Sequence, residues 1–64
     1  MNQRALIKHL EKHGCIFFRQ GKKHIIYWNP SNRKTSAIPR HREIPNKLAL
    51  KICKDLGIPP TAHA

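Results

Sequence analysis

A histidine among cations is the feature of this sequence best suited to chemistry. His24 directly follows Lys22 and Lys23, and Arg19 lies shortly before them. Imidazole has an unperturbed pKa of about 6.5, so it can take or give a proton near neutral pH. The neighbouring cations can hold a phosphate and stabilise the negative charge that develops on it during a reaction. This set suits cleavage of RNA, whose own 2′-hydroxyl is a nucleophile, although an ordinary histidine at the start of a strand fits the same residues.

A second basic group follows the third predicted strand. If that strand pairs with the strand that begins at His24, its end lies near the same edge of the sheet. We therefore take His24 as the candidate general acid or base, and the basic residues around it as candidates for binding RNA phosphates. These are Arg19, Lys22, Lys23, Arg40, His41 and Arg42.

The acidic residues are too few for a metal-dependent nuclease or phosphatase, which holds its ions with several converging carboxylates. The chain has three: Glu11, Glu43 and Asp55. His9 and His13 share a helical face without an apparent third ligand, and Cys15 and Cys53 form no C-x-x-C pair. We therefore predict no metal site and no small-molecule cofactor, and we interpret the two cysteines as buried free thiols.

The net charge predicts a polyanionic partner. Thirteen Lys and Arg against three Asp and Glu give a formal charge of +10 with His neutral, beyond the magnitude of about 2–8 that solubility requires. Cations that neutralise phosphates release condensed counterions, which supplies most of the non-specific affinity for nucleic acid. Two alternatives stay open: a surface that only confers solubility, and a basic face that binds an acidic protein rather than RNA.

The hydrophobic pattern predicts five elements in the order α-β-β-β-α. Apolar residues at helical spacing indicate a helix over 3–13, begun by Asn2 and ended by Gly14. Aromatic and β-branched runs predict three strands, over 15–20, 24–29 and 35–38. A second helix starts near Pro45 and ends at Gly57.

These elements predict one α+β domain, in which both helices cover one face of a three-stranded antiparallel sheet. A chain of 64 residues has room for a single domain over 1–64, ordered over about 3–58 with a tail over 59–64. No apolar run approaches the roughly 18–20 residues of a membrane span, and no secretory signal is visible. We therefore expect a cytoplasmic protein without membrane contact.

The middle strand is apolar on both of its faces. Ile25 and Tyr27 share one face, and His24, Ile26 and Trp28 share the other. Either the strand is central with a partner over its outer face, or Trp28 lies over a helix end, and the alternation alone does not decide between them.

An ordered set of short motifs runs through most of the chain. It comprises Leu6-Ile7-x-x-Leu10-x-x-x-Gly14, Arg19-Gln20, a glycine-containing hairpin that ends at His24, Tyr27, a proline-containing turn, Ile38-Pro39-Arg40-His41 and a closing Asp55-Leu56-Gly57-Ile58. With this set at these spacings, the sequence resembles the HicA toxins over about 5–58. The resemblance implies a fold similar to double-stranded RNA-binding domains, ribosome-independent cleavage of mRNA, and inhibition by a HicB antitoxin encoded beside the toxin.

The resemblance also assigns roles to residues. His24 matches the catalytic histidine of the family, and Arg19 with Gln20 matches the basic-polar pair before it. Lys22 and Lys23 depart from the family, which usually has Gly-Ser immediately before the histidine, so this loop is more basic. We therefore expect the toxin of a type II toxin–antitoxin system, a metal-independent endoribonuclease neutralised by an acidic HicB-like antitoxin. The alternative is a non-catalytic RNA-binding module of the same fold.

Overall fold

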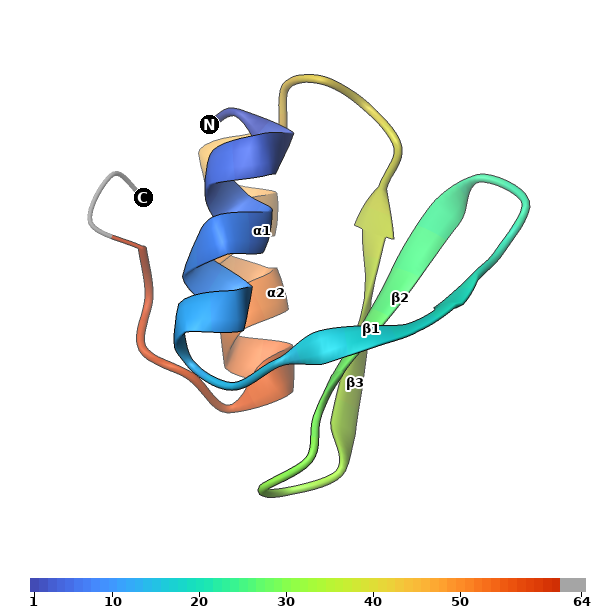
Figure 1. The fold of residues 1–64 in the computed structure, drawn as a ribbon. Coiled ribbons are helices and arrows are strands. Elements are labelled where there is room, and N and C mark those ends of the chain that lie inside the picture. The colour runs from blue at the N-terminus through green and yellow to red at the C-terminus, as the bar shows by residue number, and fades with distance from the viewer. Residues whose placement is uncertain (62–64) are drawn as a thin grey trace.

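The computed structural model describes residues 1–61 and folds them into helices and a sheet (Figure 1). In chain order the elements are α1 (Gln3–Lys12), β1 (Ile16–Gln20), β2 (His24–Asn29), β3 (Lys34–Pro39) and α2 (Asn46–Leu56). The strands form one antiparallel sheet in the order β1-β2-β3, with β2 in the middle. The predicted α+β class and the order α-β-β-β-α are therefore confirmed.

Both helices pack against one face of the sheet, and the core lies between these two layers. The sheet contributes Tyr27 from β2 and Ile38 from β3. The helices contribute buried side chains at helical spacing: Leu6, Leu10, Ala49, Ile52, Cys53 and Leu56. Because strand side chains alternate between faces, the strand neighbours of these core residues point away from the helices.

The opposite face of the sheet, called the open face below, is covered by neither helix in the part of the chain that the structure describes. Alternation along β2 puts His24, Ile26 and Trp28 on this face, because Tyr27 between them is buried on the helix side. Trp28 packs against Phe18 of β1, with ring centroids 5.9 Å apart. The ambiguity of the middle strand is thus resolved: β2 is central and carries apolar side chains on a face without a cover.

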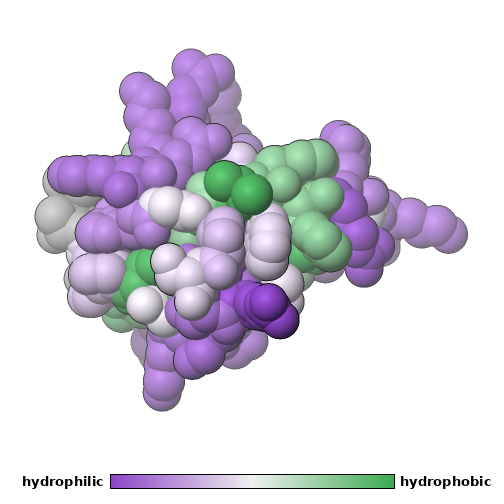
Figure 2. Space-filling view, turned by 60° about the horizontal axis from the view of Figure 1, so that its bottom comes forward, coloured by the Kyte–Doolittle hydropathy of each residue, from purple (hydrophilic) through white to green (hydrophobic). Residues whose placement is uncertain are grey.

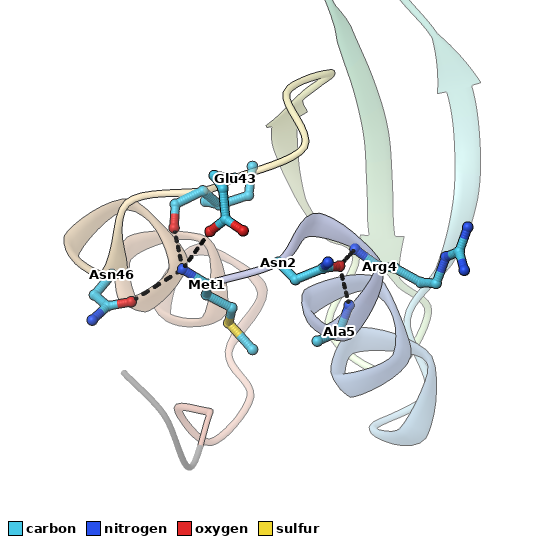
Figure 3. Close-up of polar contacts among 7 residues, drawn as sticks. Met1, Asn2, Arg4, Ala5, Glu43 and Asn46 are labelled. Atoms are coloured by element: carbon cyan, nitrogen blue, oxygen red, sulfur yellow. Dashed lines mark hydrogen bonds and ion pairs between the residues drawn. The ribbon is translucent and has the colours of Figure 1, made fainter.

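The start of α1 is fixed by Asn2, as predicted. Its side-chain oxygen accepts hydrogen bonds from the backbone N–H groups of Arg4 (2.7 Å) and Ala5 (3.3 Å) (Figure 3), which is the usual role of asparagine at a helix N-cap. The helix ends one residue earlier than the predicted range of 3–13, because His13 forms its C-cap. Gly14 then turns the chain with a φ of +88°.

The end of α2 is closed by the turn between β2 and β3. The side-chain amides of Asn29 and Asn32 both donate to the carbonyl oxygen of Leu56, at 2.9 and 3.0 Å. Gly57 follows with a left-handed φ of +68°. A Cβ on Gly57 would lie 2.5 Å from Nδ2 of Asn32, so this glycine permits a close approach as well as an unusual backbone conformation.

We expect Gly57→Ala to destabilise the fold by more than about 1 kcal/mol, because alanine disfavours the left-handed region and its Cβ would collide with Asn32. In a domain of this size that corresponds to a melting temperature lower by at least about 4–8 °C, measurable by circular dichroism. Gly14→Ala is the matched control, because Gly14 also has a positive φ but its added Cβ would meet nothing within 4 Å. Equal losses in the two variants would contradict the role given to the Asn32 contact.

The thiols of Cys15 and Cys53 are buried and free, as predicted. Burial raises the pKa of both above the ordinary value of 9.0. Because the folded-state pKa is the higher one, this contribution to stability is fully present below pH 9.0 and is lost as the pH rises through the folded-state values. Since the thiolate is the reactive form, both cysteines should be inert near neutral pH.

We therefore expect iodoacetamide to label the folded protein slowly at pH 8 and rapidly once urea unfolds it. Mass spectrometry over a time course measures both rates. Labelling in buffer as fast as in urea would contradict the burial of the two thiols.

The predicted tail over 59–64 is described only as far as residue 61. There Nε2 of His9 lies 2.7 Å from the carbonyl oxygen of Pro59, and Thr61 is buried. Pro59 therefore contacts α1, and Thr61 lies beside Cys53 of α2. The rest of that range, 62–64, lies outside the described residues.

Candidate functional site

His24 is the first residue of β2 and is exposed on the open face. Its backbone carbonyl accepts a hydrogen bond from the N–H of Gly21 at 2.8 Å, which closes the hairpin between β1 and β2. On its other side His24 pairs with Pro39 at the end of β3. The imidazole is therefore held by a paired strand and faces solvent, where a ligand can reach it.

Arg19 lies on the same face as His24. The register pairs Arg19 of β1 with Ile26 of β2, and Ile26 shares the open face with His24. Arg19 and His24 are thus diagonal neighbours across the strand pair, a relation that separates residues by about 7–8 Å. This distance suits two side chains that contact the same nucleotide.

The remaining predicted residues gather around the end of the sheet. Lys22, Lys23, Arg40 and His41 line one open pocket of about 440 Å³. A second pocket of about 400 Å³ shares Arg40 and His41 and adds Arg42. We call the six residues that surround this end of the sheet the basic edge: Arg19, Lys22, Lys23, Arg40, His41 and Arg42.

The structure brings the two basic groups together but does not put them all on one surface. The backbone N–H of Arg40 donates to the carbonyl of Lys23 at 3.4 Å, so the hairpin loop and the loop after β3 are in contact. His24 and Arg19 project on the open face, whereas neither is among the residues that line the two pockets. The basic edge therefore curves from the open face around the end of the sheet.

Arg40 is further held from β1. The side-chain amide of Gln20 is oriented so that its oxygen faces the Arg40 guanidinium. This oxygen accepts hydrogen bonds from both terminal nitrogens of Arg40, at 2.7 and 3.0 Å. Gln20 was predicted only as part of a motif. Its role in positioning Arg40 depends on a contact between the last residue of β1 and the residue after β3, which are far apart in the sequence.

The loop that carries Arg40, His41 and Arg42 is anchored to the start of α1. The side chain of Gln3 donates to the carbonyl of Pro39 at 2.8 Å, and the N–H of Gln3 donates to the carbonyl of Arg42 at 2.9 Å. The backbone that carries these three side chains is therefore held in place from α1.

Met1 reinforces the same junction. Its amino nitrogen donates to the carbonyl of Ile44 at 2.8 Å and lies 3.4 Å from the side-chain oxygen of Asn46 and 3.5 Å from a carboxylate oxygen of Glu43 (Figure 3). These contacts join the start of α1 to the segment that leads into α2.

No acidic side chain pairs with the basic edge in the part of the chain that the structure describes. Glu11 accepts from the Tyr27 hydroxyl, Glu43 contacts the amino group of residue 1, and Asp55 pairs with a lysine one turn earlier at 3.8 Å. Burial, and then the Glu11 carboxylate, raise the pKa of Tyr27 above its ordinary value. All three carboxylates are thus used elsewhere, and the basic edge keeps a positive field that attracts polyanions.

Arg4 is a further cation that sequence analysis did not include in the site. It lines the second pocket together with Arg40, His41 and Arg42. It does so because Asn2 and Glu43 form an isolated antiparallel bridge, which brings the start of α1 beside the loop after β3. No local sequence signal predicts this bridge.

Among residues 1–61, no three His, Cys, Asp or Glu side chains converge on a point that could hold a metal ion. Neither α1 nor α2 is long and apolar enough to cross a membrane.

Comparison with protein-family models matches residues 4–58 to the family described as "HicA toxin of bacterial toxin-antitoxin". The chain belongs to the HicA toxin family. The match includes His24 and the whole basic edge, and it confirms the resemblance found in the sequence. No curated protein and no solved structure matches the chain.

Membership of the HicA family makes this chain the toxin side of a toxin–antitoxin pair. HicA toxins are in general mRNA interferases.

Proposed function

We propose that the chain is a metal-independent endoribonuclease that cleaves mRNA, with His24 as a general acid or base. The observation that carries the proposal is an exposed imidazole beside cations that no carboxylate of residues 1–61 neutralises. An enzyme of this kind acts in the cytoplasm, where mRNA is found.

The chemistry uses the nucleophile that RNA itself contains. A base removes the proton of the 2′-hydroxyl, the 2′ oxygen attacks the adjacent phosphorus, and the bond from phosphorus to the 5′ oxygen breaks. An acid then gives a proton to the departing 5′ oxygen. His24 serves as one of these two groups, and His41 is the second histidine at this end of the sheet.

The basic edge supplies the electrostatic part of the reaction. The phosphorane gains negative charge as the attack proceeds, and guanidinium and ammonium groups stabilise that charge in place of a metal ion. Arg19 is the cation nearest to His24 on the open face by strand register. Lys22, Lys23, Arg40 and Arg42 hold the flanking phosphates.

The proposal is tested by incubating the purified protein with end-labelled RNA in excess EDTA. Cleavage supports the nuclease, and RNA binding without cleavage supports the alternative, a non-catalytic RNA-binding module of the same fold. Lys22 and Lys23 replace the Gly-Ser that is usual in the family, so this loop is more basic. The added charge strengthens RNA binding without supplying a catalytic group, and this favours the alternative.

We also propose that the antitoxin is an acidic HicB-like protein that covers His24 and part of the basic edge. Opposite charges speed the encounter of two proteins, and this chain carries +10. The reading frame beside the gene should encode such a protein, and it should co-purify with this chain. If the adjacent reading frame encodes a protein with a basic binding surface, the proposed partner is wrong.

A further inference from the structure

An aromatic pair lies on the open face, the same face of the sheet as the proposed catalytic histidine. Phe18 is 55% exposed, and its ring lies 5.9 Å from that of the half-buried Trp28. The pairing register shifts between Phe17 and Arg19, so the chain bulges at Phe18. Alternation from Phe17 puts Phe18 on the open face beside Trp28, and the extra residue of the bulge lets Arg19 lie on that face as well.

Phe17, the preceding residue, faces the other way. It pairs with Tyr27, whose side chain is buried on the helix side, and the two rings lie 6.2 Å apart. Phe17 is 53% exposed, which is almost the exposure of Phe18. The chain thus offers two adjacent phenylalanines of equal exposure on opposite faces of one strand.

The aromatic pair and His24 lie along the same strand direction on the open face. Trp28 and His24 are on the same face of the same strand four residues apart, which is about 13 Å at about 3.3 Å per residue. Arg19 lies opposite Ile26, which is between them on that face. An RNA strand that crosses the open face from His24 would therefore meet first a cation and then two aromatic rings.

Charge and continuity favour RNA over an apolar occupant of this face. Large exposed apolar side chains on a small monomer commonly mark a binding surface, and Figure 2, in which the lower end of the molecule in Figure 1 comes forward, shows an apolar area bordered by hydrophilic side chains. Phe18 is followed in β1 by Arg19, the member of the basic edge that lies on the open face, and this positive surface repels other cationic chains. Aromatic rings flanked by cations are the usual platform for unpaired nucleotide bases.

We propose that Phe18 and Trp28 stack unpaired bases of the RNA substrate and so restrict cleavage to single-stranded segments. This proposal rests on the proposed function, because it concerns how the same nuclease selects and positions its substrate. Bases within a duplex have no free ring face to offer, so the aromatic pair discriminates against double-stranded RNA. Base stacking on an aromatic side chain contributes about 5- to 150-fold in affinity per base.

Trp28 is the only tryptophan of the chain, so its emission reports on the platform directly. We would titrate the His24→Ala protein, chosen to leave the RNA intact, with a single-stranded oligoribonucleotide and with a duplex of the same sequence. Stacking predicts strong quenching of Trp28 by the single strand and much weaker quenching by the duplex at equal occupancy. Equal quenching by both, or none by either, would overturn the proposal.

The second arm compares Phe18→Ala with Phe17→Ala. We expect Phe18→Ala to weaken single-strand binding about 5- to 150-fold with little effect on duplex binding, and Phe17→Ala to change neither by more than about twofold. Melting curves establish that both variants are folded. Equal effects of the two substitutions on single-strand binding would overturn the proposal.

Other occupants of the open face give distinct results. If Phe18→Ala leaves RNA binding intact but weakens binding of the antitoxin, or dissociates a dimer, the face belongs to a protein and the proposal is wrong. RNA cleavage by the unmodified protein is measured separately. A result that contradicts base stacking can therefore be distinguished from one that contradicts the nuclease activity.

Discussion

RNA cleavage should fall by about 10²- to 10⁴-fold when His24 is replaced by alanine, which is the usual contribution of a general acid or base. The exposed ring has no part in the hydrophobic core, so the variant should fold and should still bind RNA. The measurement is the single-turnover cleavage rate of a labelled RNA, with binding measured in parallel.

His13→Ala is the control for this variant. His13 is also a histidine near the surface, but it forms the C-cap of α1, whereas His24 lies on the open face of the sheet. Its substitution should leave the cleavage rate within about twofold of the unmodified protein, as is usual for changes away from a reactive centre. If the His24→Ala protein cleaves RNA as fast as the unmodified protein, the imidazole takes no part in the reaction and the proposed mechanism is wrong.

The affinity for single-stranded RNA should fall about 100-fold between 50 and 200 mM salt if five phosphates are neutralised, because the logarithmic slope is about −0.7 per phosphate. Five is the number of lysines and arginines in the basic edge. The measurement is the dissociation constant for a single-stranded RNA over a salt series, with the His24→Ala protein.

The matched pair of variants for the salt series is Lys22→Gln/Lys23→Gln and Lys8→Gln/Lys12→Gln. Both remove two charges, but Lys8 and Lys12 are exposed on α1, outside the basic edge. The first pair should reduce the magnitude of the slope by about 1.4 and the second should leave it nearly unchanged. Equal reductions would show that RNA contacts the whole cationic surface rather than this edge.

The fold could be predicted from the sequence because its signals are local. Asn2 and Gly14 delimit α1, and Gly57 ends α2, each through the backbone geometry of the residue itself. The three strands followed from aromatic and β-branched runs, with small shifts at their ends. Where one strand was apolar on both sides, only the packing of the helices showed which face is open.

The candidate site was predictable in composition but not in shape. His24 and the basic edge could be named from residue types and from the family resemblance, and strand pairing brings the two basic groups together. The brace formed by Gln3, the contact of Gln20 with Arg40 and the presence of Arg4 depend on non-local contacts that no spacing rule indicates. The bulge at Phe18, which puts Phe18 and Arg19 on the same face of β1, is likewise a property of strand register.

The most direct test of metal-free catalysis through the 2′-hydroxyl is the identity of the cleaved ends. An RNA oligonucleotide and its copy with a single 2′-deoxy nucleotide at the cleavage position are incubated with the protein in excess EDTA. The proposed mechanism predicts a 2′,3′-cyclic phosphate and a 5′-hydroxyl on the cleaved RNA, and no cleavage of the 2′-deoxy copy at that position. A 3′-hydroxyl end, equal cleavage of the 2′-deoxy copy, or cleavage that appears only when a divalent metal ion is added would contradict it.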